Sequence, residues 1–220
     1  MNLKEGIIAR KSIRGFKPDP VSKETIENVL RLASRAVSSM NGQPWEFVVL
    51  TGDVMKKIAE ENMKDLDDNA APDIKDPALV DEYKRRSVGI AKQLFGAMEI
   101  ERHDLEKRNW WIRRGFRFFD APAVILICRD ERCDEKGAAF DIGAVTQNIC
   151  LAALEYGLGT CTELQAVNYQ RGLRKYLNVP ESKHFVIGVA IGYPDDSFPA
   201  NSVVSERADL EELTSWYGFE

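Results

Sequence analysis

Apolar positions recur along this chain at two spacings, one helical and one typical of strands. Between residues 22 and 36 they fall three and four apart, at Ile26, Val29 and Leu30, which predicts an amphipathic helix with Ser22 as its N-cap. The same spacing predicts further helices over residues 3–9, 53–63, 78–105, 137–156 and 168–177, with Asp53 capping the second of these. Residues 65–77 are acidic and interrupted by two prolines, and this favours a mobile connection.

Three other runs are rich in strand formers, at residues 45–51, 123–128 and 185–191, while 160–164 fits either a short strand or a loop. The run 123–128 is apolar throughout, which indicates a strand buried on both faces by helices. The helix over 137–156 is apolar almost all round, so we expect it to be buried centrally or sandwiched between two subunits. So few strands argue against a doubly wound nucleotide fold. We predict a single domain over 1–220, with 60–119 as an inserted helical excursion from the core.

Bulk composition narrows the class of protein. The chain has 220 residues and a net charge of −5, which give no reason to expect nucleic acid or an acidic membrane as a partner. The longest apolar run, 121–128, is too short to span a bilayer, and the N-terminus has no secretory h-region. The four cysteines form no short-range disulfide framework. These observations predict a cytoplasmic protein.

A basic cluster near the N-terminus is the main candidate for chemistry. Arg10, Lys11, Ser12 and Arg14 fall within five residues, after a short apolar run. A guanidinium offers a planar fork of donors that matches phosphate oxygens, and a hydroxyl adds a neutral donor. The cluster suits a phosphate monoester or a phosphorylated cofactor. A solvated basic turn is the alternative.

Other signals are weak. The two histidines have no ligand spacing, so we predict no metal site, and Cys161 has no histidine placed as its base. The glycines at 157 and 159 read as an ordinary helix stop. Residues 108–117 interleave arginines with aromatic side chains, as in proteins that bind single-stranded nucleic acid. The negative net charge instead favours an amphipathic lid.

Several motifs taken in order resemble one family. They are the segment Arg-Lys-Ser-Ile-Arg-Gly-Phe at 10–16, Ser-Ser-Met-Asn-Gly-Gln-Pro-Trp at 38–45, Ala-Pro at 121–122, Asp-Ile-Gly at 141–143, Gly-Leu-Gly-Thr-Cys at 157–161, Gly-Tyr-Pro at 192–194, and Arg207. The chain thus resembles the FMN-dependent nitroreductases of the nitroreductase/flavin-reductase superfamily. The resemblance implies an α+β three-layer fold, with a small, mainly antiparallel sheet flanked by helices, and an intertwined homodimer with FMN at the subunit interface.

The resemblance also implies a set of cofactor-binding residues. Arg10, Ser12 and Arg14 would contact the phosphate, ribityl chain and pyrimidine edge of FMN, with Lys11 beside them. Ser38, Ser39 and Asn41 would approach the FMN bound mainly by the other subunit, and Arg207 would close on the phosphate. The segment Thr160, Cys161, Thr162, Glu163, Leu164 would lie against the isoalloxazine ring near N5. The chain departs from the family pattern at Thr162, where Trp or Pro is common, and beside Arg207, where a second cation is common.

The implied activity is an NAD(P)H-dependent, ping-pong reduction of small aromatic acceptors such as nitroaromatics or quinones. Arg14 would act as the catalytic cation at the N1/O2 edge of the flavin. The candidate substrate-pocket residues are Phe95, Trp110, Trp111 and Phe116, in a lid that resembles nitrobenzoate reductases, where an arginine could hold a substrate carboxylate. The alternatives are a reductive dehalogenase, a flavin reductase, a flavin-binding protein without a substrate, and a helical interaction protein.

Overall fold

The computed structural model describes residues 2–75 and 77–219. Its helices are α1 (Leu3–Ala9), α2 (Lys23–Ala33), α3 (Gly52–Asp67), α4 (Asp81–Ala97), α5 (Leu105–Phe116), α6 (Glu135–Glu155), α7 (Gln170–Tyr176) and α8 (Leu210–Leu213), with 3-10 turns η1 (Ser39–Asn41), η2 (Phe118–Asp120) and η3 (Pro199–Ser202). Its strands are β1 (Glu46–Thr51), β2 (Ala123–Asp130), β3 (Gly159–Glu163) and β4 (Lys183–Gly192). The fold is therefore a mixed α+β one, as expected.

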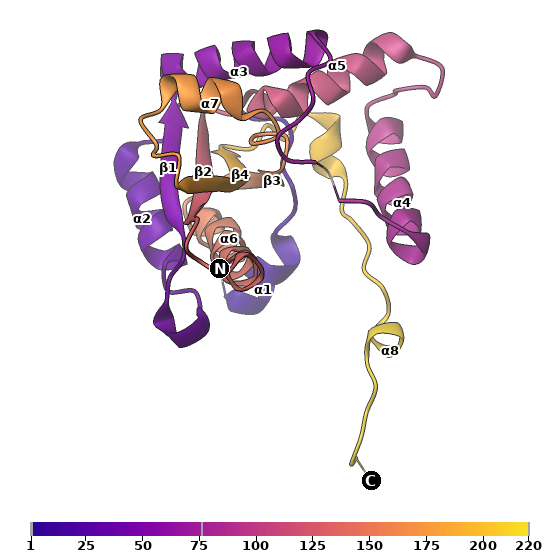
Figure 1. Ribbon diagram of the computed structural model, residues 1–220. Helices are drawn as coiled ribbons and strands as arrows, with labels where there is room; N and C mark the ends of the chain where they lie inside the picture. The colour runs from indigo at the N-terminus through magenta and orange to yellow at the C-terminus, as the bar shows by residue number, and fades with distance from the viewer. Residues whose placement is uncertain (1, 76, 220) are drawn as a thin grey trace.

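The four strands form one sheet in the order β1-β2-β4-β3, and every neighbouring pair is antiparallel (Figure 1). Of the segment 160–164, for which the sequence fits either a strand or a loop, residues 160–163 belong to the edge strand β3, and Leu164 follows it. On the outer side of β3, residues near the N-terminus add a further extended stretch. Ser12 bridges Thr160, and the backbone N–H of Ile13 donates to the carbonyl of Thr160 at 2.9 Å. Residues 10–16, here called the basic segment, thus run along the outer edge of β3.

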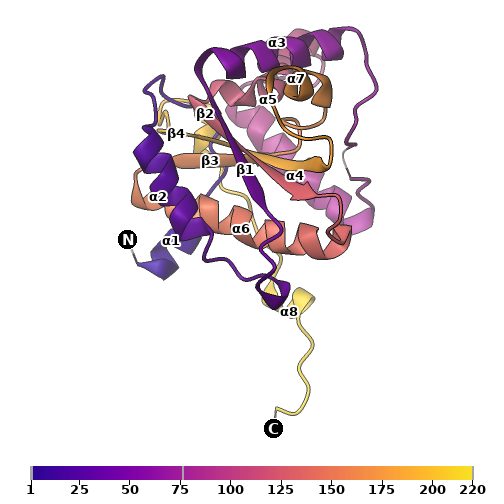
Figure 2. The same cartoon turned by 60° about the vertical axis from the view of Figure 1, so that its left-hand side comes forward.

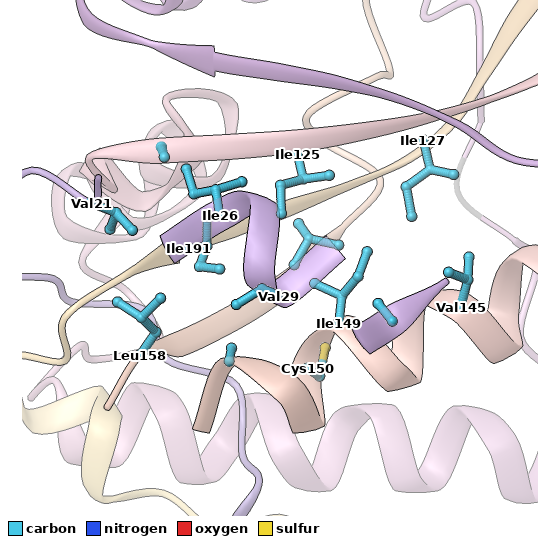
Figure 3. Close-up of a cluster of buried hydrophobic side chains, with 14 of the residues drawn as sticks. Val21, Ile26, Val29, Ile125, Ile127, Val145, Ile149, Cys150, Leu158 and Ile191 are labelled. Carbon is cyan, nitrogen blue, oxygen red and sulfur yellow. The ribbon is translucent and has the colours of Figure 1, made fainter. Parts of the chain in front are cut away.

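Helices cover both faces of the sheet, with α3, α5 and α7 on one side and α2 and α6 on the other (Figures 1 and 2). Successive side chains of β2 point to opposite faces of the sheet, so this strand packs against the helices on both sides. Ile125 and Ile127 pack against Val145 and Ile149 of α6 (Figure 3), whereas Leu126 packs with Ile58 of α3. The four residues 124–127 are fully buried, which confirms the prediction of a strand covered on both faces.

Helix α6 is buried along one side only in a single chain. Ile142, Val145 and Ile149 face the sheet, but Phe140 is 75% exposed, and Gly143 and Gln147 also face outward. The alternative of a centrally buried helix is therefore wrong. By length and composition α6 is also able to cross a membrane, a test that an apolar core helix passes as well.

Several predicted boundaries need correction. The helix expected over 78–105 is shorter, because Val80 is extended and Glu99 has a left-handed φ of 52°, so that α4 and α5 are separate. Asp53 lies inside the first turn of α3 and does not cap it, since Thr51 is the N-cap residue. The connection expected from residue 65 starts later. Asp65 still belongs to α3, where it is buried and forms an ion pair with Arg171, with 2.6 Å between Asp65 Oδ1 and Arg171 Nη2.

Other local predictions are confirmed. The Ser22 hydroxyl accepts a hydrogen bond from the backbone N–H of Thr25 at 3.0 Å and caps α2. Gly157 follows α6 with a φ of 68°, a conformation that glycine adopts without strain. After β4 the chain returns to the basic segment through η3 and then leaves the body of the protein as an extended tail carrying α8 (Figures 1 and 2).

Candidate functional site

A hollow of about 450 Å³ opens where the basic segment, β3 and α6 meet. Arg10 and Ser12 line it from the basic segment, and Thr162 and Leu164 line it from β3 and the residue after it. The remaining wall comes from α6 and β4 and is largely apolar; it consists of Ala139, Ile142, Gly143, Thr146, Gln147, Cys150, Val186 and Ile187. The structure therefore brings together four of the residues that sequence nominated for cofactor binding. A cavity with an apolar wall and cationic donors at one end suits a ring system that carries an anion.

Arg10 and Arg14 are cations without counter-ions in an acidic protein. Both are partly buried, yet neither has a carboxylate within 4 Å among residues 2–75 and 77–219, whereas nine other arginines of the chain do. A partly buried charge is stabilised by an opposite one, so these two guanidinium groups are available to an anionic ligand. Lys11, between them, is also partly buried.

The backbone of Arg14 is held in place by a residue that sequence reasoning missed. Asn201, in η3, is 3% exposed. Its side-chain oxygen accepts hydrogen bonds from the N–H groups of Arg14 (2.7 Å) and Gly15 (3.2 Å), and its amide donates to the carbonyl oxygens of Gly15 (2.7 Å) and Asp195 (2.9 Å). A lone asparagine in a polar stretch gives no sequence signal for such a role.

A second missed residue, Arg114, links helix α5 to the basic segment. Its guanidinium donates to the carbonyl oxygens of Arg14 (2.9 Å) and Phe119 (3.1 Å) and pairs with Asp120 at 2.8 Å. Burial lowers the pKa of Arg114, against the opposing effect of Asp120. Arg114 was visible in sequence only as one of several cations in the 108–117 run.

The side chains of Cys161 and Glu163 point to the α5 side of the sheet. Cys161 packs with Phe119 and Ala190, and burial raises its pKa to about 12, which favours the protonated thiol near neutral pH. Glu163 is buried as well, and burial raises its pKa well above the ordinary value while the charge of Arg14 opposes that shift. Arg14 also lies 6.0 Å from the centre of the Phe119 ring.

Other nominated residues lie elsewhere in the single chain. The loop with Ser38, Ser39 and Asn41 sits beside the N-terminal half of α6, where the Ser39 N–H donates to the Asp141 carboxylate at 3.2 Å. Arg207 lies in the tail, and with Arg85 and Arg86 of α4 it lines a separate hollow of about 530 Å³. Within a single chain, therefore, neither the loop with Ser38 nor Arg207 lines the hollow that contains Arg10 and Ser12.

The four aromatic side chains nominated for a substrate pocket fall into two groups. Phe116 is 7% exposed and stacks on Tyr169 with ring centres 5.4 Å apart, which places it in the packing between α5 and the loop before α7. Trp110 is exposed on α5, and its ring centre lies 6.4 Å from that of Trp111, which is partly buried and packs against Phe119. Phe95 of α4 is partly buried and faces the guanidinium of Arg108, 5.1 Å from its ring centre. Three of the four candidates therefore have open surface.

A sequence profile described as "Nitroreductase family" matches residues 7–193. This chain belongs to the nitroreductase family. A nitrobenzene nitroreductase of Ectopseudomonas oleovorans is 35% identical to it over 214 residues, with 94% of this chain and 93% of that protein covered. A 4-nitrobenzoate reductase of a Nocardioides strain is 29% identical over 222 residues, with 94% of this chain and 87% of that protein covered. The crystal structure of the FMN-dependent nitroreductase NfnB from Mycobacterium smegmatis in complex with NADPH matches with a TM-score of 0.90 at 27% identity, over 97% of each chain.

The matched range of this nitroreductase-family chain contains the basic segment, β3 and helices α4 and α5, but it ends before Asn201 and Arg207. The hollow beside β3 therefore lies within the part of the fold that the family shares. The elements that hold the basic segment from the C-terminal side lie beyond the matched range.

Proposed function

We propose that this chain is an FMN-dependent oxidoreductase that uses NAD(P)H to reduce nitroaromatic, quinone or related electron-poor acceptors. The observation that carries the proposal is the partly buried, uncompensated guanidinium group of Arg10 at the hollow beside β3, with a second such group, that of Arg14, four residues later in the basic segment. The donor set fits FMN, because cationic and hydroxyl donors stand at one end and an apolar wall follows. The family membership and the similarity to an FMN-dependent nitroreductase whose structure is in complex with NADPH support the same function.

The resemblance to the family assigns a role to each of these residues, and their chemistry is compatible with it. Arg10, Lys11 and Ser12 would bind the phosphate and ribityl end, and Arg14 would stabilise negative charge at the pyrimidine edge. The backbone of residues 160–164 would lie along the ring. FMN, when bound, supplies hydride acceptance and donation, while the protein orients donor and acceptor in turn and excludes water. Trp110, Trp111 and Phe95 would cover the acceptor from the lid.

We also propose an intertwined homodimer. Exposed apolar side chains gather on α1 and α6, which contact each other, and in the loop before β1; they include Ile8 (70% exposed), Met40 (99%) and Phe140 (75%). The loop is strained, with left-handed φ values at Met40, Asn41 and Gln43. The tail carries Trp216, Tyr217 and Phe219, all exposed, away from the body. A second copy would cover these surfaces and would bring Ser38, Ser39, Asn41 and Arg207 to its FMN.

The absorption spectrum of the purified protein tests the proposed cofactor and donor together. We expect the visible bands of bound flavin, their loss on anaerobic addition of NADH or NADPH, and their return when nitrobenzene is added. Nitrobenzoate, a quinone and iodotyrosine serve as comparison acceptors and separate nitro reduction from the dehalogenase alternative. A colourless protein that does not bind added FMN would refute the proposal. Equal turnover of nitrobenzene and nitrobenzoate would argue against an arginine that holds a carboxylate.

The dimer is tested by Phe140→Glu, which places a charge on the exposed face of α6, and by Arg207→Ala. Sedimentation should show a dimer for the natural protein and dissociation for Phe140→Glu. Arg207→Ala should stay dimeric but bind FMN about tenfold more weakly, because a phosphate contact is lost. Arg35→Ala, at another exposed arginine, is the matched control and should change neither property. A monomeric natural protein that binds FMN tightly would exclude the shared site.

A further inference from the structure

Glu163 is a buried acid without a partner. It is 6% exposed, and neither of its carboxylate oxygens has a hydrogen-bond partner among residues 2–75 and 77–219. Its place is set by the register of the sheet. Glu163 pairs with Gly188, whose side-chain position faces Leu126 and Ala166 on the α3 and α5 side. A buried, unpaired carboxylate is costly, so the neutral acid is the form that this environment favours.

The charged groups around Glu163 are few. Burial raises the pKa of Glu163, whereas the charge of Arg14, in the basic segment, lowers it. Burial likewise raises the pKa of Cys161, two residues earlier on the same strand, which Arg14 lowers and Glu163 raises further. From α5, Arg114 reaches the carbonyl oxygen of Arg14, and its charge is balanced by Asp120 of η2. Glycine at position 188 brings no titratable group from β4. Arg14 is thus the charge that Glu163 can influence, and no carboxylate in the described residues lies within 4 Å of Arg14.

We propose that Glu163 is a positioning residue for Arg14: as a neutral acid it leaves the Arg14 charge free for an anionic group, and on ionisation it pairs with Arg14 and withdraws that charge. The inference rests on the proposed function, in which Arg14 faces the pyrimidine edge of FMN. An arginine keeps its charge at every accessible pH, so the protonation state of Glu163 decides whether that charge is compensated. In a poorly solvated site such a pair interacts far more strongly than in water.

The test compares the natural protein with Glu163→Gln, which is permanently neutral and similar in shape. The FMN dissociation constant of the natural protein should rise about tenfold as the pH is raised and Glu163 ionises. In E163Q it should stay at the value that the natural protein has at low pH. Glu135→Gln, at an exposed carboxyl of α6, is the control and should keep the pH dependence of the natural protein.

A second readout needs no FMN. Burial raises the pKa of Glu163 in the folded state above its unfolded value, so its favourable contribution is fully present below the unfolded pKa and is lost as pH rises toward the folded one. The free energy of unfolding of FMN-free protein in urea should therefore fall more steeply with rising pH in the natural protein than in E163Q. Parallel curves for the two proteins would overturn the proposal.

The outcomes separate the two claims. If the natural protein binds no FMN at any pH, the proposed function fails and this proposal fails with it. If FMN binds but its affinity does not change with pH, or changes equally in E163Q, only the role of Glu163 is refuted. Should E163Q not fold, the infrared band of the protonated carboxyl and the FMN affinity of the natural protein must share one midpoint; separate midpoints overturn the proposal.

Discussion

Asn201 accepts a hydrogen bond of 2.7 Å from the backbone N–H of Arg14, across 187 residues of sequence. The same side chain also bonds the N–H and the carbonyl of Gly15. The basic segment has a single bridge to β3 around Ser12, so the orientation of Arg14 depends on η3 at the far end of the chain. This relationship makes the position of the basic segment sensitive to changes in η3, near the other end of the sequence.

Asn201→Ala should destabilise the protein by about 2–4 kcal/mol, because several buried backbone groups lose their partner at once. Urea unfolding measures this directly, and FMN affinity should fall with it as Arg14 loses its anchor. Ser202→Ala is the neighbouring control, since the Ser202 hydroxyl is exposed and makes a local bond to Pro199. A change within a few tenths of a kcal/mol for Asn201→Ala would contradict the role assigned to this amide.

Gly15→Ala should also destabilise the protein, because a Cβ at Gly15 would lie 2.2 Å from Cγ of Phe198. Overpacking of this kind costs about 1–3 kcal/mol. The double variant Gly15→Ala, Phe198→Ala should recover most of the loss that the first change causes, which a double-mutant cycle measures. Gly89→Ala in α4 meets no atom within 4 Å and should be neutral or slightly stabilising. Additive effects at positions 15 and 198 would argue against the contact.

Arg114→Leu should cost about 2 kcal/mol or more, since two carbonyl oxygens, of Arg14 and Phe119, lose a charged donor. Because the change also frees α5 from the basic segment, the KM for the aromatic acceptor should rise. Arg113→Leu, one residue earlier, removes an ion pair with Asp67 at the surface and should cost less than about 1 kcal/mol. Equal losses for the two variants would place Arg114 among ordinary surface cations.

Alkylation should distinguish the partly exposed Cys133 from the three buried cysteines. The pKa of Cys128 and of Cys161 is raised to about 12 by burial, so their thiolate fraction near pH 8 is very small. Cys150 is 5% exposed, whereas Cys133 is partly exposed. Mass spectrometry after iodoacetamide treatment of the folded protein should find a single label, on Cys133, and none in Cys133→Ser. Rapid labelling of Cys161 would show that β3 opens in solution.

Local pattern alone was enough to predict much of the fold. The helical spacing around Ile26 and Val29, the Ser22 cap and the glycine stop at Gly157 are all read correctly, because each depends on residues adjacent in sequence. The unbroken apolar run in β2 also predicted its burial on both faces. The boundary between α4 and α5 was missed, because a left-handed turn at Glu99 leaves no gap in the apolar spacing.

The sequence by itself determined which side chains are chemically able to bind a phosphorylated ring: the guanidinium groups of Arg10 and Arg14 and the hydroxyl of Ser12. Only the tertiary structure decided what surrounds them. The amide of Asn201 and the guanidinium of Arg114 contact the basic segment across long sequence separations, and the buried carboxyl of Glu163 is left without a partner; no local period encodes such arrangements. Their effect arises from burial, because in a site shielded from water an unpaired donor, acceptor or charge is costly, and the folded arrangement determines which of them find partners.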